Sequence, residues 1–402
     1  MAKKPNIRFA GFEDDWEQRK LGEICDSFEY GLNAAATDYD GENKYIRITD
    51  IDDNSHEFLQ NKVTSPDIDF SGAENYKLKQ GDILFARTGA SVGKTYIYKE
   101  SDGVVYYAGF LIRGRVKDEY SPEFVFQNTL TADYERFIRI TSQRSGQPGV
   151  NAQEYASYKI ATPVLEEQQQ IGAYFSTLDH LITLHQRKCD ELKKVKKFML
   201  QKMFPKKGEK NPEIRFDGFT NDWEQRKFSE LYAKSSEKND GSIGMDRNIT
   251  VATMQFKEDV KVSTAEYLKT YYTFNLGDIA FEGHQSKEFR YGRFVENDIG
   301  NGIVSHIFAV FRPIKEFDLQ FWKYAINNEM LMQRILSRST KASTMMHDLV
   351  TEDFLNETFL VPSLNEQKQI GTYLKSIDHL INLHQCKCKS CKKYYKCTRK
   401  LK

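Results

Sequence analysis

The chain has 402 residues, 40% of them hydrophobic and 29% charged, and its 58 basic residues nearly balance 57 acidic ones. No run of about 18 apolar residues offers a membrane span, and no apolar stretch follows the first lysines as in a secretory signal. We therefore expect a cytoplasmic globular protein of more than one domain, with its six cysteines reduced. Its net charge of +1 is too small for a protein that binds polyanions over its whole surface.

The chain opens with a block that recurs later in the sequence. Residues 7–24, IRFAGFEDDWEQRKLGEI, match residues 214–231, IRFDGFTNDWEQRKFSEL, at 12 of 18 positions. A second pair, residues 163–186 and 362–385, matches at 15 of 24 positions. Between these blocks the copies share little beyond a Gly-Asp-Ile turn. The sequence therefore predicts a pseudo-two-fold internal repeat with a common frame and two different inserted segments.

The first inserted segment, residues 25–162, alternates short β-rich runs with turn signals. Residues 82–86 and 95–98 have the β-branched and aromatic composition of strands. A helix is predicted over residues 122–141, with a counterpart over residues 319–336. These patterns predict a domain of mixed α/β type in each copy.

Residues 87–98, RTGASVGKTYIY, resemble a phosphate-binding loop, which would make the protein a nucleotide-binding enzyme. Such a loop needs four residues between its glycines, but only three separate Gly89 from Gly93. It must also open a helix, whereas the residues from Thr95 onward have the composition of a strand. The run is better interpreted as a turn between two strands that exposes polar side chains, namely Arg87, Thr88, Ser91 and Lys94.

A second polar loop follows the predicted helix in each copy, TSQRSGQPGVN at 141–151 and SRSTKAST at 337–344. Arginine, glutamine and hydroxyl side chains can contact base edges or phosphates, although solvated loop residues are the simpler explanation. The candidate DNA contacts of the first copy are Arg87, Thr88, Ser91, Lys94, Gln143, Arg144 and Gln147. Those of the second copy are His284, Gln285, Lys287, Arg290, Ser339, Lys341 and Thr344.

Long helices are predicted to begin after Pro163 and Pro362. Their apolar residues recur at alternating steps of three and four, which is the spacing of a coiled-coil seam. Two such helices can pair antiparallel, or each can pack on its own domain. The expected packing residues are Ile171, Tyr174, Leu178, Leu181, Leu192, Ile370, Tyr373, Ile377 and Leu380.

The last residues, CKCKSCKKYYKCTRKLK at 386–402, depart from the repeat and carry eight basic and no acidic residues. Four cysteines invite a zinc site, but their spacing is not that of a usual structural one. We expect a cationic, poorly helical tail and no bound metal.

These features together resemble the specificity subunit of type I restriction-modification systems. The resemblance rests on the DWEQRK openings, the Gly-Asp-Ile turns and the EQ-x-QIG and DHLI-x-LHQ segments, and it covers almost the whole chain. It implies an α+β fold with two target-recognition domains separated by two long helices that form an antiparallel coiled coil. The expected bounds are 1–162 and 206–361 for the domains, 163–205 for the first helix, and 362–402 for the second helix with the tail.

The resemblance implies a non-catalytic protein that recognises a bipartite double-stranded DNA site. Its partners would be two methyltransferase subunits, which carry S-adenosylmethionine, and restriction subunits, which use ATP and Mg²⁺. No cofactor is expected in this chain. The nucleotide-binding enzyme and a coiled-coil scaffold without DNA recognition remain as alternatives, and the half-site sequences and their spacing cannot be derived from the residues.

Overall fold

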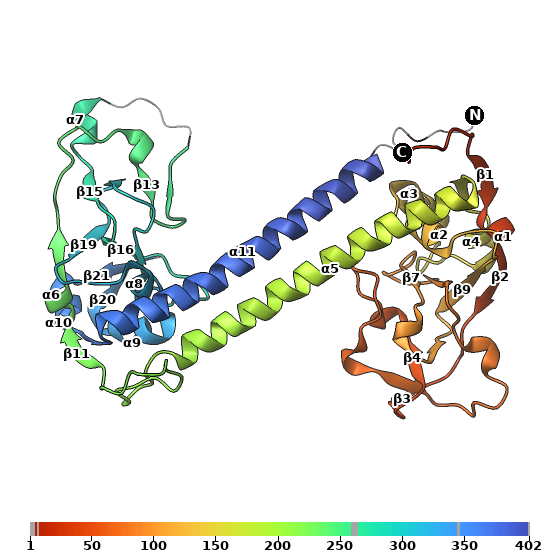
Figure 1. Ribbon diagram of the computed structural model, residues 1–402, viewed down its shortest axis with the longest axis horizontal. Coiled ribbons are helices and arrows are strands. Elements are labelled where there is room, and N and C mark those ends of the chain that lie inside the picture. The colour runs from red at the N-terminus through yellow and green to blue at the C-terminus, as the bar shows by residue number, and fades with distance from the viewer. Residues whose placement is uncertain (1–4, 6–7, 259–263, 344–345, 401–402) are drawn as a thin grey trace. The chain divides into compact units, whose positions relative to one another are not determined.

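The computed structural model describes residue 5 and residues 8–258, 264–343 and 346–400. The chain divides into two compact units (Figure 1). The first unit comprises Met1–Arg187 with Gln385–Lys402, and the second comprises Lys188–His384. Within the described ranges, no helix is long and apolar enough to cross a membrane.

Four antiparallel strands form the main sheet of the first unit, in the order β2-β9-β6-β7. Their bounds are Cys25–Tyr30, Leu111–Val116, Asp82–Ala86 and Thr95–Ile97. The central strand β6 is buried along its length, because Ile83 and Phe85 enter one apolar core while Leu84 enters another. A sheet covered on both faces explains why this run lacks the polar alternation of a half-exposed strand.

Short elements complete the first unit. Outside the sheet, β3 pairs with β5 and β4 runs parallel to β8, with bounds Ala36–Asp38, Thr64–Pro66, Lys44–Ile46 and Val105–Tyr107. The α-helices α1 to α4 are Leu21–Ile24, Pro122–Asn128, Ala132–Thr141 and Ala152–Ala156. Four 3₁₀ turns cover Ile48–Asp50, Gln60–Lys62, Glu74–Tyr76 and Glu100–Asp102.

The second unit repeats this topology with the sheet order β12-β19-β16-β17. Its strands are Tyr232–Ser235, Ala309–Pro313, Ile279–Glu282 and Arg293–Glu296. The smaller pairs are β13 with β14, β15 with β18 and β20 with β21, with bounds Ile249–Thr250, Gln255–Phe256, Tyr272–Phe274, Gly302–Val304, Thr340–Ala342 and His347–Leu349. The helices α6 to α10 are Phe228–Leu231, Ala265–Leu268, Leu319–Ile326, Glu329–Ser339 and Thr351–Asn356, and a 3₁₀ turn covers Met245–Arg247.

The prediction of one helix over 122–141 and one over 319–336 was wrong, because each segment contains two helices. In the first unit, the Thr131 hydroxyl accepts a hydrogen bond from the Tyr134 amide at 3.3 Å and starts a new helix. In the second, the Asn328 side chain does the same for Met330 at 3.1 Å. Side chains that cap the backbone in this way compete with continuation of the preceding helix.

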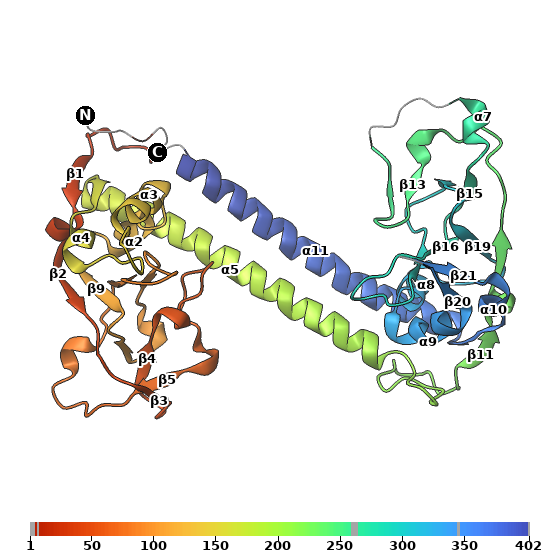
Figure 2. The same ribbon diagram turned by 180° about the vertical axis from the view of Figure 1, so that it is seen from behind.

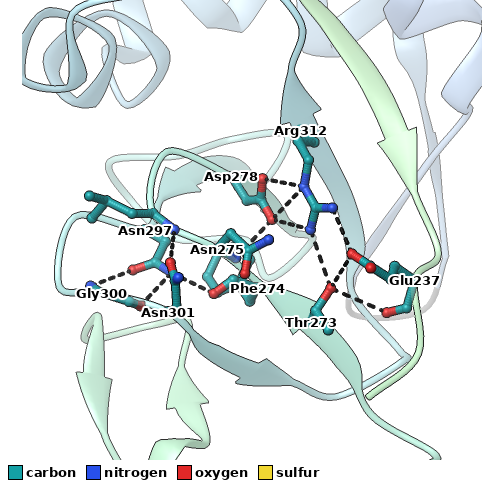
Figure 3. Close-up of polar contacts among 10 residues, drawn as sticks. Glu237, Thr273, Phe274, Asn275, Asp278, Asn297, Gly300, Asn301 and Arg312 are labelled. Carbon is teal, nitrogen blue, oxygen red and sulfur yellow. Dashed lines mark hydrogen bonds and ion pairs between the residues drawn. The ribbon is translucent and has the colours of Figure 1, made fainter. Parts of the chain in front are cut away.

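The Gly-Asp-Ile turns are structural in both units. Asp82 accepts two hydrogen bonds from Arg115, at 2.9 and 2.8 Å. Asp278 accepts the same pair from Arg312, at 3.1 and 3.0 Å (Figure 3). Burial raises the pKa of Asp278 above its usual range, although the bonds from Arg312 oppose the shift. Gly277 precedes this aspartate with a φ of +88°, which only glycine adopts without strain.

The repeated blocks tie each domain to its own long helix. Arg8 donates to Glu167 at 2.7 and 2.8 Å, and Arg215 donates to Glu366 at 2.7 and 2.9 Å. The Trp223 indole N–H also donates to Glu366 at 3.2 Å. Both glutamates are at most 1% exposed, so each arginine is the counter-ion of a buried carboxylate. Identical residues in the two copies therefore form equivalent arginine–glutamate pairs between the domain and its long helix.

Two further strand pairs come from the same blocks. β1 (Glu17–Lys20) pairs with β10 (Lys159–Thr162), and β11 (Glu224–Lys227) pairs with β22 (Thr358–Val361), both antiparallel. Each of these pairs leads the chain from the variable domain into its long helix.

The long helices are α5 (Leu165–Lys202) and α11 (Leu364–Lys400) (Figure 1 and Figure 2). In the first unit the early part of α5 meets the late part of α11, where the Phe175 and Tyr395 rings lie 5.5 Å apart. In the second unit the late part of α5 meets the early part of α11, where Lys196 and Asp378 are 2.7 Å apart. This order confirms the predicted antiparallel pairing.

Packing on the domain and packing on the other helix both occur, at different turns. Ile171 and Ile370 are buried in the cores of their own units, and Leu178 packs against the first of these cores. Ile377 is buried between the helices with Cys189 and Ile381, and Leu192 and Tyr373 pack against them. Leu181 is partly buried, whereas Tyr174 and Leu380 are 37% and 41% exposed. A straight helix has 3.6 residues per turn, so its buried face drifts relative to a 3.5-residue apolar repeat. The buried residue of α11 is therefore Ile381, one residue after the predicted Leu380.

The expectation of a poorly helical C-terminal tail was wrong, because α11 continues to Lys400. The segment lacks Gly and Pro, and two of its side chains pack on α5. Cys388 is buried, with its sulfur 3.9 Å from the Ile182 carbonyl, and Tyr395 contacts Phe175. Packing of one face therefore maintains a helix whose other face is cationic.

Candidate nucleic-acid interface

The turn between β6 and β7 lies beside the second polar loop of the first unit. The Gly89 amide donates to the Pro148 carbonyl at 3.0 Å, and the Val150 amide donates to the Arg87 carbonyl at 2.9 Å. Thr88 and Gly149 form an isolated β-bridge. Two segments about 60 residues apart in the sequence thus form one surface.

The turn is a strand-turn-strand connection, as predicted. Phe85 pairs with Thr95 across it, and Thr95 begins β7 and not a helix. The Lys94 ammonium donates a hydrogen bond to the Ile51 carbonyl at 3.1 Å and forms an ion pair with Asp53. A phosphate-binding lysine would need to point its charge into the turn, so this geometry does not form a nucleotide site.

The predicted contact residues of the first unit differ in how much of their chemistry is available. Arg144 donates to both oxygens of Glu154, at 2.6 and 2.7 Å, and Lys94 is also paired. Gln143 and Gln147 are exposed. Thr88 and Ser91 are partly buried, and the Thr88 hydroxyl lies 3.4 Å from the Pro148 carbonyl oxygen.

Arg87 has a different environment from the other arginines of this surface. Its guanidinium carbon lies 5.1 Å from the centre of the Tyr30 ring and 6.0 Å from the centre of the Phe110 ring. Among the described residues, its side chain has neither a carboxylate partner nor a hydrogen bond. The guanidinium is therefore held by aromatic faces while its donors stay available.

The second unit brings the equivalent loops together. The His347 amide donates to the Gly283 carbonyl at 2.8 Å, and His284 forms a β-bridge with Met346. A Cβ atom on Gly283 would lie 2.1 Å from the His347 carbonyl oxygen, so the close approach of the two segments requires glycine. The 283–292 loop and the β20-β21 hairpin therefore share one surface.

The predicted contact residues of the second unit are mostly on this surface. His284, Gln285, Lys287 and Arg290 are exposed on the loop, and Lys341 is exposed on β20. Ser339 is fully buried, and its hydroxyl donates to the Ile335 carbonyl at 2.9 Å. It therefore stabilises α9 and does not face a ligand. Thr344 lies outside the described residues.

Tyr30 and Phe110 were not predicted from the sequence as part of this surface. They are 42% and 60% exposed, and both border the paired loops of the first unit through Arg87. Aromatic residues in β-rich segments are usually buried, and nothing in the local sequence distinguishes these two. Their common location depends on tertiary contacts, namely the bond from the Arg87 amide to the Phe110 carbonyl, at 3.0 Å, and the packing of the Arg87 guanidinium on both rings.

A family described as "Type I restriction modification DNA specificity domain" matches residues 13–194 and 220–390. The chain is 24% identical over 388 residues to the type I restriction enzyme MjaVIII specificity subunit of Methanocaldococcus jannaschii, covering 92% of this chain and 88% of that one. It is 27% identical over 197 residues to a putative MjaX specificity subunit of the same organism, covering 48% and 46%. The crystal structure of a type I restriction-modification S subunit from M. genitalium has the same fold, with a TM-score of 0.63, 11% identity and coverage of 99% and 98%.

Proposed function

Since this chain belongs to the family of type I restriction-modification DNA specificity domains, we propose that it is a non-catalytic specificity subunit that recognises a bipartite DNA site. Each recognition domain takes one half-site. The observation that carries the proposal is the recurrence of one loop pair, 87–94 with 142–150 and 283–292 with 340–349, on two copies of the same frame.

The residues of these loops have the chemistry of base and phosphate recognition. The first surface offers the free donors of Arg87 and the amides of Gln143 and Gln147. The second offers exposed cations, including Lys287 and Lys341. Arginine and glutamine side chains match guanine and adenine edges, and lysines match phosphates. Because the two sets differ, the two half-sites are expected to differ in sequence.

The frame has the features of a docking surface for a partner present in two copies. All four residues of β1 and all four of β11 are exposed, and both strands have the sequence EQRK. Folding alone does not constrain exposed side chains to be identical in two otherwise divergent copies. Beside β11, a polar cavity of about 380 Å³ is lined by residues of the repeated block, including Asp222, Glu224 and Arg226. Two methyltransferase subunits would fit such a duplicated surface.

The reaction chemistry then belongs to the partners. The methyltransferase subunits would supply S-adenosylmethionine, and restriction subunits would supply ATP and Mg²⁺. Adenine methylation requires the base to leave the stack and enter a pocket on those partners. This chain would choose the site and hold the two recognition domains on the paired helices α5 and α11, whose length would set the half-site spacing.

The proposed function can be tested by mapping the methylated adenines of a whole genome. The full chain is co-expressed with its cognate methyltransferase in an unmethylated host, and modified adenines are mapped by single-molecule sequencing. We expect a split motif with a fixed unspecified gap, and exchange of residues 25–162 for those of a relative should change one half-site only. An assembled complex that methylates no defined motif would instead identify the chain as a coiled-coil scaffold.

A further inference from the structure

We propose that Tyr30 and Phe110 hold Arg87 as a fixed guanidinium plane that recognises one guanine in the half-site of the first domain. The inference rests on the function proposed above. It identifies one base of the half-site, the side chain that contacts it and the residues that orient that side chain. Arg87 would touch the base. Tyr30 and Phe110 would act through Arg87 and are positioning residues.

The pairing of charges in the first domain distinguishes Arg87 from other arginines. Arg8, Arg115 and Arg144 each donate two hydrogen bonds to one carboxylate, at 2.6 to 2.9 Å. Arg87 is also partly buried, yet no carboxylate among the described residues accepts from it. A guanidinium that is partly removed from water without a counter-ion is unfavourable in the free protein. An acceptor supplied by a ligand would restore the balance.

The rings of Tyr30 and Phe110 are unusually exposed for aromatic side chains. Phe110 is 60% exposed and Tyr30 is 42% exposed, so neither ring contributes fully to a core. Their shared contact is Arg87, at 5.1 Å from Tyr30 and 6.0 Å from Phe110. Stacking of aromatic faces on a guanidinium limits its rotation and leaves its edge donors free. Because these rings are exposed, they add little apolar burial to the fold, whereas their contact with Arg87 orients its guanidinium.

Hydrogen bonds to the backbone hold all three residues in place. The Arg87 amide donates to the Phe110 carbonyl at 3.0 Å, and its carbonyl accepts from Val150 at 2.9 Å. The Tyr30 hydroxyl accepts from the Ala152 amide at 3.3 Å. Three chain segments therefore converge on one side chain. A preformed donor loses little conformational entropy on binding, which favours specific base contact over diffuse phosphate contact.

Guanine is the base that fits this group. It presents two acceptors, O6 and N7, on its major-groove edge, and the planar fork of arginine donates to both. In the second domain this position holds no arginine, since the strand register places Gly283 where the first domain has Arg87. The effect of Arg87 should therefore be confined to the half-site of the first domain.

The test uses the full chain assembled with its methyltransferase, and duplexes that carry the methylated motif with each G·C pair of the first half-site replaced in turn. For the wild type, replacement of one particular G·C pair should lower the affinity for the duplex about 5- to 150-fold. Arg87→Ala and Arg87→Lys should bind the original and the replaced duplex with equal affinity. Phe110→Leu and Tyr30→Leu should weaken discrimination at that same pair, and the second half-site should be unchanged. Arg136→Ala, which removes an exposed arginine from α3, is the matched charge control and should preserve the motif.

Each other outcome overturns the inference. Uniform weakening by Arg87→Ala at every duplex would identify a phosphate contact. Effects of Phe110→Leu or Tyr30→Leu at a different base pair, or at none, would separate the rings from Arg87. A wild-type complex without a split motif would refute the proposed function itself, whereas a split motif that survives Arg87→Lys would refute only the guanine contact.

Discussion

Replacement of Glu296 by isoleucine should stabilise the second unit and abolish part of its pH dependence. Glu296 is 3% exposed, and neither carboxyl oxygen has a hydrogen-bond partner among the described residues. Burial raises the pKa of Glu296 well above its usual range, and the nearby Asp298 raises it further, whereas Lys323 opposes the shift. The first unit shows that the position does not require a carboxylate, because Ile97 occupies it there, opposite Ile83, as Glu296 lies opposite Ile279.

The sign of the effect follows from proton uptake. Well below pH 4.5, the ordinary pKa of a glutamate, the carboxyl is protonated in both the folded and the unfolded state, and its contribution to stability is constant. Between 4.5 and the raised folded-state pKa, the folded protein holds a proton that the unfolded chain releases. The free energy of unfolding of the wild type then falls by about 1.4 kcal/mol for each pH unit. This fall continues as the pH rises towards the raised folded-state pKa of Glu296, and Glu296→Ile should not show it.

The assay is urea unfolding of the full chain at pH 5, 6, 7 and 8, followed by tryptophan fluorescence. Glu296→Gln, which removes the charge but keeps polar atoms, should also flatten the pH dependence while stabilising less than isoleucine. Glu316→Gln removes an exposed carboxylate of the same unit and should leave the slope unchanged. Parallel pH profiles for wild type and Glu296→Ile would refute the argument, because the carboxyl would then be ionised in both states.

Two further predictions concern the frame and the loop contact. Arg215→Ala leaves Glu366 buried without its counter-ion and should lower the free energy of unfolding by about 3 kcal/mol, measured by the same urea assay; a change below about 1 kcal/mol would show that the pair is solvated. Gly283→Ala forces the loop away from the His347 carbonyl and should reduce methylation at wild-type sites at least about tenfold by loss of contacts in the second half-site, whereas Gly146→Ala, at an uncrowded loop position, should have no effect.

The repeated blocks made the frame predictable. Glu167 and Glu366 lie at matching places in matching sequence, and each binds the arginine of its own block. Two long helices with 3.5-residue apolar spacing have few ways to bury their stripes, and one of these is the observed antiparallel pair. The length of α11 was not predictable by comparison of the copies, because its last turns keep no repeat similarity and fold through packing of Cys388 and Tyr395.

The candidate interface was predictable only in part. The sequence identified both loops of each domain as polar turns, but their contact, such as Thr88 with Gly149, depends on distant strands meeting in space. Composition also does not reveal which side chains are already paired. Lys94 and Arg144 look as available as Arg87 in the sequence, yet only Arg87 has no carboxylate partner among the described residues.

The two units show how one frame can carry two specificities. Positions that close the frame, such as Asp82 and Asp278, keep both their residue and their arginine partner. Positions facing the loop surface diverge, and Arg87 in one unit corresponds to Gly283 in the other. Because the loops are anchored through backbone hydrogen bonds, side chains can change without loss of the anchor, except where a close approach requires glycine, as at Gly283. Specificity can therefore vary at the loops while the joints that position the domains stay constant.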